Sequence, residues 1–334
     1  MSGSLIKEGK DPVATPLGIG LIGLGRHGMR YARHLLEPLP NARLVAVCRR
    51  DAVAGKSFAE RHALRFYPHY QDLVSDSTVR AIAVVTPPSL TRAICLEAVR
   101  ARKPILIEKP LATSGPEAAE MVRAAESAGV PLMTAQTLRF EAAIQALKAE
   151  RRSVGTPRYL VLTVRAVPRP EILRELADYA GRGVLLEIGV HLLDLVRFMT
   201  GEEVADVRCE LRGSGPGKPE HLALVSLHTT SGLGCIIEVS RVSAGRTGRL
   251  EWVGDEGQLT ADWIGHRLSQ VTPQAVKEWS VQERPTVVAA LEGFVTALER
   301  GDPMPVTGLD GQRAVEIADA CYESAATGRA VRVG

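Results

Sequence analysis

The 334-residue sequence contains few aromatic residues, few cysteines and almost no net charge. Aromatic residues make up 4% of the chain, and Lys plus Arg (41) exceed Asp plus Glu (38) by only three. Nucleic acids and anionic membranes are bound by clustered positive charge, so the sequence indicates neither kind of partner. No apolar run reaches the length of a membrane span, and residues 1–16 lack the apolar segment of a signal peptide. We therefore expect a cytoplasmic protein.

The five cysteines are odd in number and widely separated along the chain. They form no CxxC pair and no cluster with histidine, so the sequence predicts neither a disulfide framework nor a zinc site, and we expect no metal. Isolated cysteines usually pack as small apolar side chains. Those of this chain are Cys48, Cys95, Cys209, Cys235 and Cys321.

Short apolar runs alternate with helical stretches in the first part of the chain, at 17–22, 44–48, 81–85, 104–107 and 132–135. This alternation predicts an α/β fold with a doubly wound parallel sheet of the Rossmann type. From about residue 157, longer strands with Gly-rich turns predict an antiparallel or mixed sheet. We expect a flexible arm at 1–16, a dinucleotide-binding domain at 17–140 and a second α/β domain at 141–334.

A glycine-rich motif follows the first predicted strand and opens the first predicted helix. It reads Gly23-Leu24-Gly25-Arg26-His27-Gly28, which is GxGxxG. Gly23 permits a tight turn, Gly25 lets the backbone approach a pyrophosphate, and Gly28 lets the helix pack on the strand. Because a helix N-terminus also offers free N–H groups to an anion, this motif, with Arg26 and His27 inside it, predicts a dinucleotide site.

The end of the second predicted strand should contact the ribose of the dinucleotide. An NAD site usually places a carboxylate there, but this chain has Arg49 and Arg50. A guanidinium binds a 2′-phosphate, which favours NADP as the cofactor and leaves Asp51 to cap the following helix. In the alternative interpretation, the two arginines face solvent and Asp51 contacts the ribose of NAD.

Two motifs fall at the carboxyl ends of predicted parallel strands, where such sheets bind ligands. They are Thr86-Pro87-Pro88 and Glu108-Lys109-Pro110. We expect Thr86, Pro87, Glu108 and Lys109 to contact the cofactor. Lys109 could also stabilise charge on a reacting oxygen, although a solvated lysine is the alternative.

A third candidate cluster lies near residue 190. Glu187, His191 and Asp194 follow one another at i, i+4 and i+7, so a helix would place them on one face. A histidine can accept the proton of a substrate hydroxyl, but taken alone His191 could equally be a packed structural histidine.

Together these motifs resemble the Gfo/Idh/MocA oxidoreductases, from about Leu17 to Val333. The resemblance also includes Gly189-Val190-His191-Leu192-Leu193-Asp194, Pro305-Val306-Thr307-Gly308 and Ala326-Thr327-Gly328-Arg329. It implies a Rossmann domain followed by an α/β domain with a large, open, mostly antiparallel sheet that forms a homodimer or homotetramer interface. It further implies a cis peptide before Pro110, Lys109 as the catalytic-site lysine and His191 as the general acid/base.

The chain departs from this family's pattern at three positions. Glu187 stands where the family usually has aspartate, which adds about 1.5 Å of reach. Thr91 and Thr137 replace a histidine and an asparagine, the second of them just before Arg139-Phe140. We expect Lys109, Arg139, Glu187 and His191 to contact substrate, with Lys109, Glu187 and His191 catalytic.

The resemblance implies a sugar, polyol or sugar derivative as substrate. The sequence therefore predicts an oxidoreductase that moves hydride between NADP, or NAD, and a hydroxyl or carbonyl carbon. Two alternatives remain open at this point. One is a non-catalytic, dinucleotide-dependent regulator on the same fold, and the other is reduction of an imine or an unsaturated bond.

Overall fold

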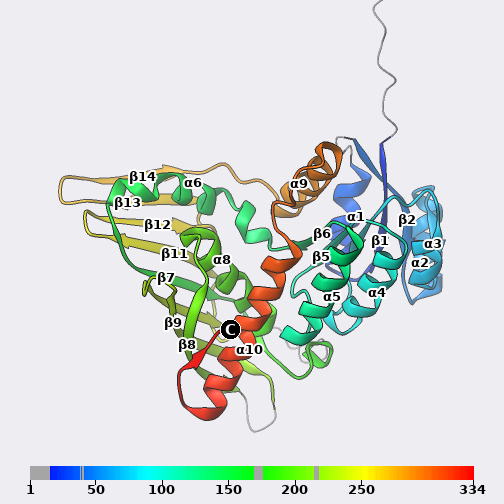
Figure 1. Ribbon diagram of the computed structural model, residues 1–334. Coiled ribbons are helices and arrows are strands. Elements are labelled where there is room, and N and C mark those ends of the chain that lie inside the picture. The colour runs from blue at the N-terminus through cyan, green and yellow to red at the C-terminus, as the bar shows by residue number, and fades with distance from the viewer. Residues whose placement is uncertain (1–15, 38, 40, 169–175, 214–217) are drawn as a thin grey trace, which may run out of the picture.

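The computed structural model of the protein describes residues 16–334 except 38, 40, 169–175 and 214–217 (Figure 1). Of the expected flexible arm, all but residue 16 lies outside the described residues. The chain forms one six-stranded and one nine-stranded sheet, with helices packed on and between them. None of the helices within the described residues is long and apolar enough to cross a membrane. The five cysteines are free and buried.

The first sheet is parallel throughout and confirms the Rossmann prediction. Its strands are β1 (Leu17–Ile22), β2 (Ala42–Cys48), β3 (Arg65–Tyr67), β4 (Ala81–Val84), β5 (Ile105–Glu108) and β6 (Leu132–Ala135). They lie in the order β3-β2-β1-β4-β5-β6. Every residue of β4, β5 and β6 is buried, as expected for strands that are covered by helices on both faces.

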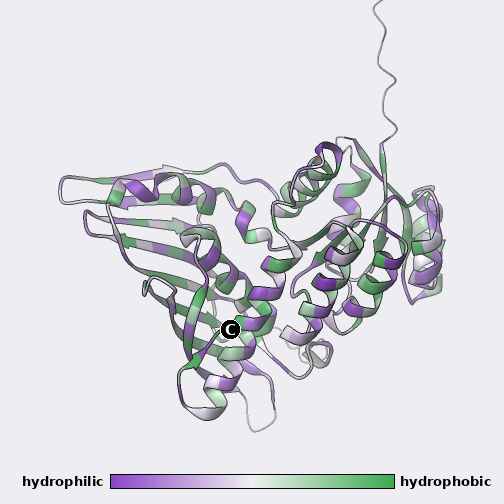
Figure 2. Cartoon of the chain, viewed as in Figure 1, coloured by the Kyte–Doolittle hydropathy of each residue, from purple (hydrophilic) through white to green (hydrophobic). Residues whose placement is uncertain are grey.

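Five helices of the N-terminal part connect these strands. They are α1 (Gly28–Leu36), α2 (Ala52–Arg61), α3 (Tyr70–Ser75), α4 (Pro88–Arg100) and α5 (Gly115–Ala128). Hydrophilic and hydrophobic residues alternate along α4 and α5 in Figure 2, because one side of each helix packs on the sheet and the other meets solvent.

The second sheet is mixed and mostly antiparallel, which also confirms the prediction. Its strands are β7 (Pro157–Arg165), β8 (Val204–Gly213), β9 (Glu220–Thr229), β10 (Gly234–Ser240), β11 (Thr247–Gly254), β12 (Gln258–Asp262), β13 (Arg267–Val271), β14 (Val276–Ser280) and β15 (Val331–Arg332). The order is β14-β13-β12-β11-β7-β10-β9-β8-β15, and only β7 and β10 pair in parallel. Buried residues alternate with more exposed ones along β9 and β11, so one face of this sheet packs on helices.

Four helices within the described residues belong to the second part of the chain. They are α6 (Ala142–Glu150), α8 (Val190–Thr200), α9 (Thr286–Arg300) and α10 (Gly308–Thr327). Shorter helical turns are η1 (Thr137–Phe140), η2 (Arg151–Val154), η3 (Leu176–Tyr179) and η4 (Leu185–Gly189), the last of which is a π-helical turn. Figure 1 shows α10 between the two sheets, where it contacts α5, α8 and β8.

One helix crosses the boundary expected from the sequence. The helix α9 lies far beyond residue 140, yet it packs on the parallel sheet, where it contacts α1, η1 and β6. Its side chains Val287, Leu291 and Phe294 are fully or almost fully buried in the same apolar cluster as Leu21 and Met133. The core of the N-terminal part is therefore completed by a segment from near the end of the chain.

Candidate active site

The glycine loop lies between β1 and α1 and has the geometry that a pyrophosphate requires. Gly23 has φ +103°, and a Cβ there would meet the carbonyl oxygen of Val85 at 2.2 Å. A Cβ on Gly28 would lie 2.0 Å from the carbonyl oxygen of Gly23, so helix and loop pack directly on each other. A Cβ on Gly25 would meet nothing within 4 Å, which leaves that side of the loop open to a ligand.

The end of β2 places a guanidinium beside this loop. Arg49 donates a hydrogen bond of 3.2 Å to the carbonyl oxygen of Leu24, inside the glycine motif. Asp51 is the N-cap of α2, because its side chain accepts a hydrogen bond from the Ala54 backbone N–H at 3.0 Å. Asp51 also lies 3.6 Å from Arg49, and Arg50 is exposed. The predicted cap is confirmed.

A cavity of about 630 Å³ opens next to the glycine loop, at the carboxyl ends of the parallel strands. Most of the predicted site residues line it: Gly25, Arg26, His27, Gly28, Thr86, Pro87, Glu108, Lys109, Glu187 and His191. Four do not, namely Gly23, Arg49, Arg50 and Arg139. The cavity therefore brings together residues of the glycine loop, two strand ends and the segment near residue 190.

A buried carboxylate connects the glycine loop to β5. Glu108 Oε1 accepts a hydrogen bond from Tyr31 Oη at 2.6 Å and forms a second one with His27 Nε2 at 2.7 Å. The other carboxylate oxygen, Oε2, accepts a hydrogen bond from the Lys109 backbone N–H at 3.0 Å. Burial alone would raise the pKa of Glu108, but the hydrogen bonds from His27 and Tyr31 and the charges of His27 and Lys109 hold that pKa at about 2. Glu108 is therefore ionised and fixed in place.

The side chain of Lys109 points from the end of β5 toward η4. The peptide bond between Lys109 and Pro110 is cis, as the resemblance implies. Lys109 Nζ donates a hydrogen bond of 2.6 Å to the backbone carbonyl oxygen of Glu187. An ammonium group has three donors, so two N–H groups remain for a substrate or cofactor oxygen.

The carboxylate of Glu187 pairs with an arginine that sequence reasoning did not identify. Arg241 donates two parallel hydrogen bonds to Glu187, from Nε at 2.8 Å and from Nη2 at 2.5 Å. The two side chains are 13% and 12% exposed, so the pair is largely shielded from solvent. Glu187 thus binds Lys109 through its main chain and Arg241 through its side chain.

His191 lies in the first turn of α8 and lines the cavity. Its Nδ1 atom is buried and has no hydrogen-bond partner within the described part of the chain, and the same holds for Thr86 Oγ1. Burial, together with the positive charges of Lys109 and His27, lowers the pKa of His191 to about 3, although the charge of Glu108 opposes this. The imidazole is therefore neutral at physiological pH.

The expected single face of Glu187, His191 and Asp194 forms only in part, because Glu187 and His191 line the same cavity and Asp194 does not. Glu187 belongs to the π-helical turn η4, whereas α8 begins only at Val190, so the regular helical spacing is broken. Asp194 is buried and accepts hydrogen bonds from Arg139 Nε at 2.7 Å and Nη2 at 2.6 Å.

Arg139 is therefore placed away from the cavity, and the structure does not bring it to the substrate position expected for it. Its Nη2 also lies 2.9 Å from Asp310 Oδ1, which in turn accepts a hydrogen bond of 2.9 Å from Arg197. This cluster joins η1, α8 and α10. Thr91 is likewise buried, and its hydroxyl donates to the carbonyl oxygens of Pro88 and Leu111.

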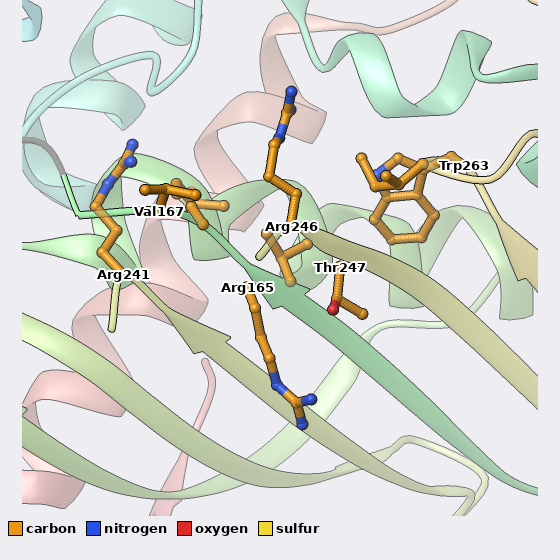
Figure 3. Close-up of a pocket in the computed structure, with 10 residues that line it drawn as sticks. Arg165, Val167, Arg241, Arg246, Thr247 and Trp263 are labelled. Atoms are coloured by element: carbon orange, nitrogen blue, oxygen red, sulfur yellow. The ribbon is translucent and has the colours of Figure 1, made fainter. Parts of the chain in front are cut away.

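A second hollow of about 410 Å³ adjoins the first, and the two share Ile188, Arg241 and Arg246. Figure 3 shows the second hollow at the carboxyl end of β7, with Trp263 on one side. No local motif distinguishes Arg241 or Arg246 in the sequence, because sheet pairing alone brings them to the site. No cluster of three or more His, Cys, Asp or Glu side chains that could hold a metal ion occurs among the described residues.

Comparisons with known proteins agree with this geometry. Residues 17–136 match the model of an oxidoreductase family with an NAD-binding Rossmann fold, and residues 137–260 match the GFO/IDH/MocA C-terminal domain. An inositol 2-dehydrogenase of Acidothermus cellulolyticus is 30% identical, with 94% of each chain covered. A D-apiose dehydrogenase of Rhizobium rhizogenes is 27% identical over 96% of this chain and 98% of its own.

Solved structures show the same relationship. An oxidoreductase of Agrobacterium radiobacter, crystallised with NAD⁺, L-tartaric acid and magnesium, has a TM-score of 0.85 and 26% identity over 96% of this chain and 99% of its own. The family models, the similar enzymes and the glycine loop with its adjoining cavity all lead to one assignment. The chain belongs to the Gfo/Idh/MocA family of NAD-binding oxidoreductases.

Proposed function

We propose that this protein is a nicotinamide-dependent dehydrogenase that transfers hydride to or from a hydroxyl-bearing or carbonyl carbon of a sugar, polyol or sugar derivative. The observation that carries the proposal is one cavity that contains the open side of the glycine loop, Lys109 and His191. The names of similar enzymes, which act on inositol and apiose, support a polyol or sugar as substrate. When bound, the nicotinamide cofactor supplies or accepts the hydride.

The chain itself supplies proton transfer and charge stabilisation in this proposal. In the oxidative direction, the neutral ring of His191 accepts the proton of the substrate hydroxyl. Lys109 donates a hydrogen bond to the same oxygen and stabilises the negative charge that develops there. In the reductive direction the two groups work in reverse, so that His191 returns the proton to the oxygen.

Glu187 acts as a positioning residue in this scheme, and not as the catalytic residue expected from the sequence. Its main-chain carbonyl accepts a hydrogen bond from Lys109 Nζ, and its carboxylate is occupied by Arg241. The carboxylate is therefore committed to a guanidinium. The additional methylene relative to aspartate gives this side chain the length to reach Arg241, while Lys109 stays fixed near His191.

We also propose that NADP is the preferred cofactor. Arg49 extends from the end of β2 toward the glycine loop, where a guanidinium would neutralise a 2′-phosphate. Asp51 is used as a helix cap and is paired with Arg49, so it is poorly placed to select a ribose hydroxyl. Fluorescence titrations with NADPH and NADH test this preference. We expect the parent protein to bind NADPH more tightly than NADH and the Arg49→Asp variant to lose this preference. Equal or tighter binding of NADH by the parent protein would refute the proposed NADP preference.

Turnover of a panel of polyols and sugars tests the catalytic roles. We expect His191→Ala to lower kcat by about 10²–10⁴-fold, and Lys109→Ala to lower it by about 10²–10³-fold. The matched controls are His228→Ala and Lys56→Ala, because both side chains are exposed and neither lines the cavity. Unchanged turnover in both cavity variants would show that the roles are wrong. Tight cofactor binding without turnover of any compound would favour the alternative that the protein is a non-catalytic, dinucleotide-dependent regulator.

We further propose that the protein assembles into a homodimer or homotetramer through the nine-stranded sheet. Tyr159, Leu224 and Ile236 lie on neighbouring strands and are 46%, 42% and 49% exposed. An exposed apolar group of this kind on a sheet face is typical of an interface. Light scattering should give a dimer or tetramer for the parent protein and a smaller species for Ile236→Lys. A monomeric parent protein would refute the proposal.

A further inference from the structure

Three arginines lie around the carboxyl end of β7, namely Arg165, Arg241 and Arg246. They differ in the acidic side chains with which they pair. β10 and β11 flank β7, with Ser240 and Thr247 both in register with Arg165. Arg241 follows Ser240 and Arg246 precedes Thr247, so the two arginines emerge on either side of the end of β7. With neighbouring strands about 4.8 Å apart, their main chains are roughly 10 Å apart, close enough for both side chains to reach one ligand.

Figure 3 shows the guanidinium groups of Arg241 and Arg246 directed to the same side of the sheet, whereas Arg165 points to the opposite side. Arg165 is neutralised there by Glu238, through hydrogen bonds of 2.7 and 2.5 Å. Arg241 is neutralised by Glu187, which uses its Nε and Nη2 atoms and leaves Nη1 without an acceptor among the described residues.

Arg246 differs from both. It lines both hollows, is exposed, and forms no ion pair with any carboxylate of the described residues. Positive side chains outnumber negative ones among the residues that line the first cavity. The positive ones are Arg26, Arg30, Lys109, Arg241 and Arg246, and the negative ones are Glu108, Asp178 and Glu187. Positive charge is therefore in excess among the described lining residues, next to those that we propose to carry the reaction.

We propose that Arg246, with Nη1 of Arg241, binds an acidic group of the substrate, a carboxylate or a phosphate, so that the enzyme acts on an acidic sugar or polyol. Two guanidinium groups on one side of a hollow form the geometry that binds such oxygens with charge-assisted hydrogen bonds. The second hollow has a volume of about 410 Å³, and in this proposal it holds the acidic end of the substrate. Trp263 and Val167 give it an apolar wall, which excludes water from one side of the ion pair.

This inference deepens the proposed function and rests on it for the reaction, but its test needs no turnover. Isothermal titration of the protein saturated with reduced cofactor would measure the affinities of D-glucitol, D-gluconate and D-glucitol 6-phosphate. None of these probes has a ketone or aldehyde group to be reduced, and the bound cofactor blocks the pyrophosphate site. The carboxylate and phosphate probes separate the two sources of negative charge.

We expect at least one acidic probe to bind about tenfold more tightly than D-glucitol at low salt, with the advantage reduced at high salt. In Arg246→Ala the ratio of the two dissociation constants should approach one. Arg249→Ala is the matched control, since this exposed arginine lies three residues further along, in β11, and lines neither hollow. The control should keep the ratio of the parent protein.

The outcomes separate this inference from the proposed function. Equal affinities for neutral and acidic probes, or a ratio that persists in Arg246→Ala, would overturn the acidic-substrate inference even if neutral polyols are oxidised. Selective binding that depends on Arg246 would support it even if none of the polyols tested for turnover reacts, in which case only the proposed reaction would fail.

Discussion

The ion pair between Glu187 and Arg241 allows a quantitative test of how the site is held together. Its two hydrogen bonds, at 2.5 and 2.8 Å, join side chains that are 13% and 12% exposed. Replacing Glu187 by Gln or Arg241 by Met leaves the other charge largely shielded from water without its counter-charge. We expect each single variant to be less stable than the parent protein.

The expected magnitude follows from this burial. Removing one partner of a buried ion pair costs about 3–5 kcal/mol, whereas exposed pairs contribute about 0–1 kcal/mol. Because both side chains retain some contact with solvent, we expect each substitution to lower the free energy of unfolding by about 2–3 kcal/mol. In the double variant no charge is left unpaired, so its cost should be smaller than the sum by about 1.5–3 kcal/mol.

The chain provides both a reporter and a control for this double-mutant cycle. Its three tryptophans lie in or next to the nine-stranded sheet, so their fluorescence in urea titrations reports the unfolding of that part; they are Trp252, Trp263 and Trp279. The control pair is Arg165 and Glu238, which has the same two-bond geometry but side chains that are 46% and 25% exposed. Its coupling should be below about 1 kcal/mol. Equal coupling in the two cycles would refute the argument that burial makes the Glu187 pair strong.

Three further predictions concern protonation and the glycine loop. Since the pKa of His191 is about 3, kcat/KM for oxidation should stay level from about pH 8 to about pH 5 and fall only below that, and a pH–rate profile with an acid limb near 6.5 would contradict this. The pKa of Glu108 in the folded protein is about 2, below its usual value of 4.5. The ionised carboxylate therefore stabilises the fold at pH values above 4.5, and this contribution is lost as the pH falls toward 2. The loss of stability in Glu108→Gln should therefore shrink between urea titrations at about pH 7 and pH 3, and a constant difference would count against it. Gly28→Ala should lower the melting temperature because its Cβ would meet the Gly23 carbonyl oxygen at 2.0 Å, whereas Gly25→Ala should melt like the parent protein yet bind the dinucleotide more weakly.

The parts of the site that the sequence predicted are those formed by neighbours along the chain. The glycine loop follows directly from a strand, a turn and a helix, and Lys109 from its place at the end of a buried strand. His191 was identified by a short motif that starts at Gly189. Such features depend on local geometry, so spacing in the sequence is enough to find them.

The parts that the sequence did not predict depend on contacts between distant segments. Arg241 and Arg246 reach the site because β10 and β11 both pair with β7, and strand pairing of this kind is not encoded in spacing. Arg139 was expected at the substrate, but burial next to Asp194 and Asp310 occupies its guanidinium elsewhere. Asp194 was expected on the same face as Glu187 and His191, but it is buried against Arg139 and does not line the cavity.

The fold class was predicted, but several strands of the second sheet were not. The segments that form β12, β13 and β14 are short, and β14 is exposed along its whole length, so it shows no alternation of apolar and polar residues. Such an edge strand is fixed by pairing with β13. The placement of α9 on the parallel sheet also depends on packing between distant segments.

This placement of α9 matters for anyone who exchanges parts between related enzymes to alter cofactor choice. A transplanted segment that ends at residue 140 would carry the glycine loop and Arg49 but not Leu291 and Phe294, which complete its apolar core. The recipient protein would have to supply matching side chains from its own late helix. In this chain the unit of exchange is therefore discontinuous: it comprises the N-terminal sheet, residues 286–300, and Val315 of α10, which is buried in the other apolar cluster of that sheet.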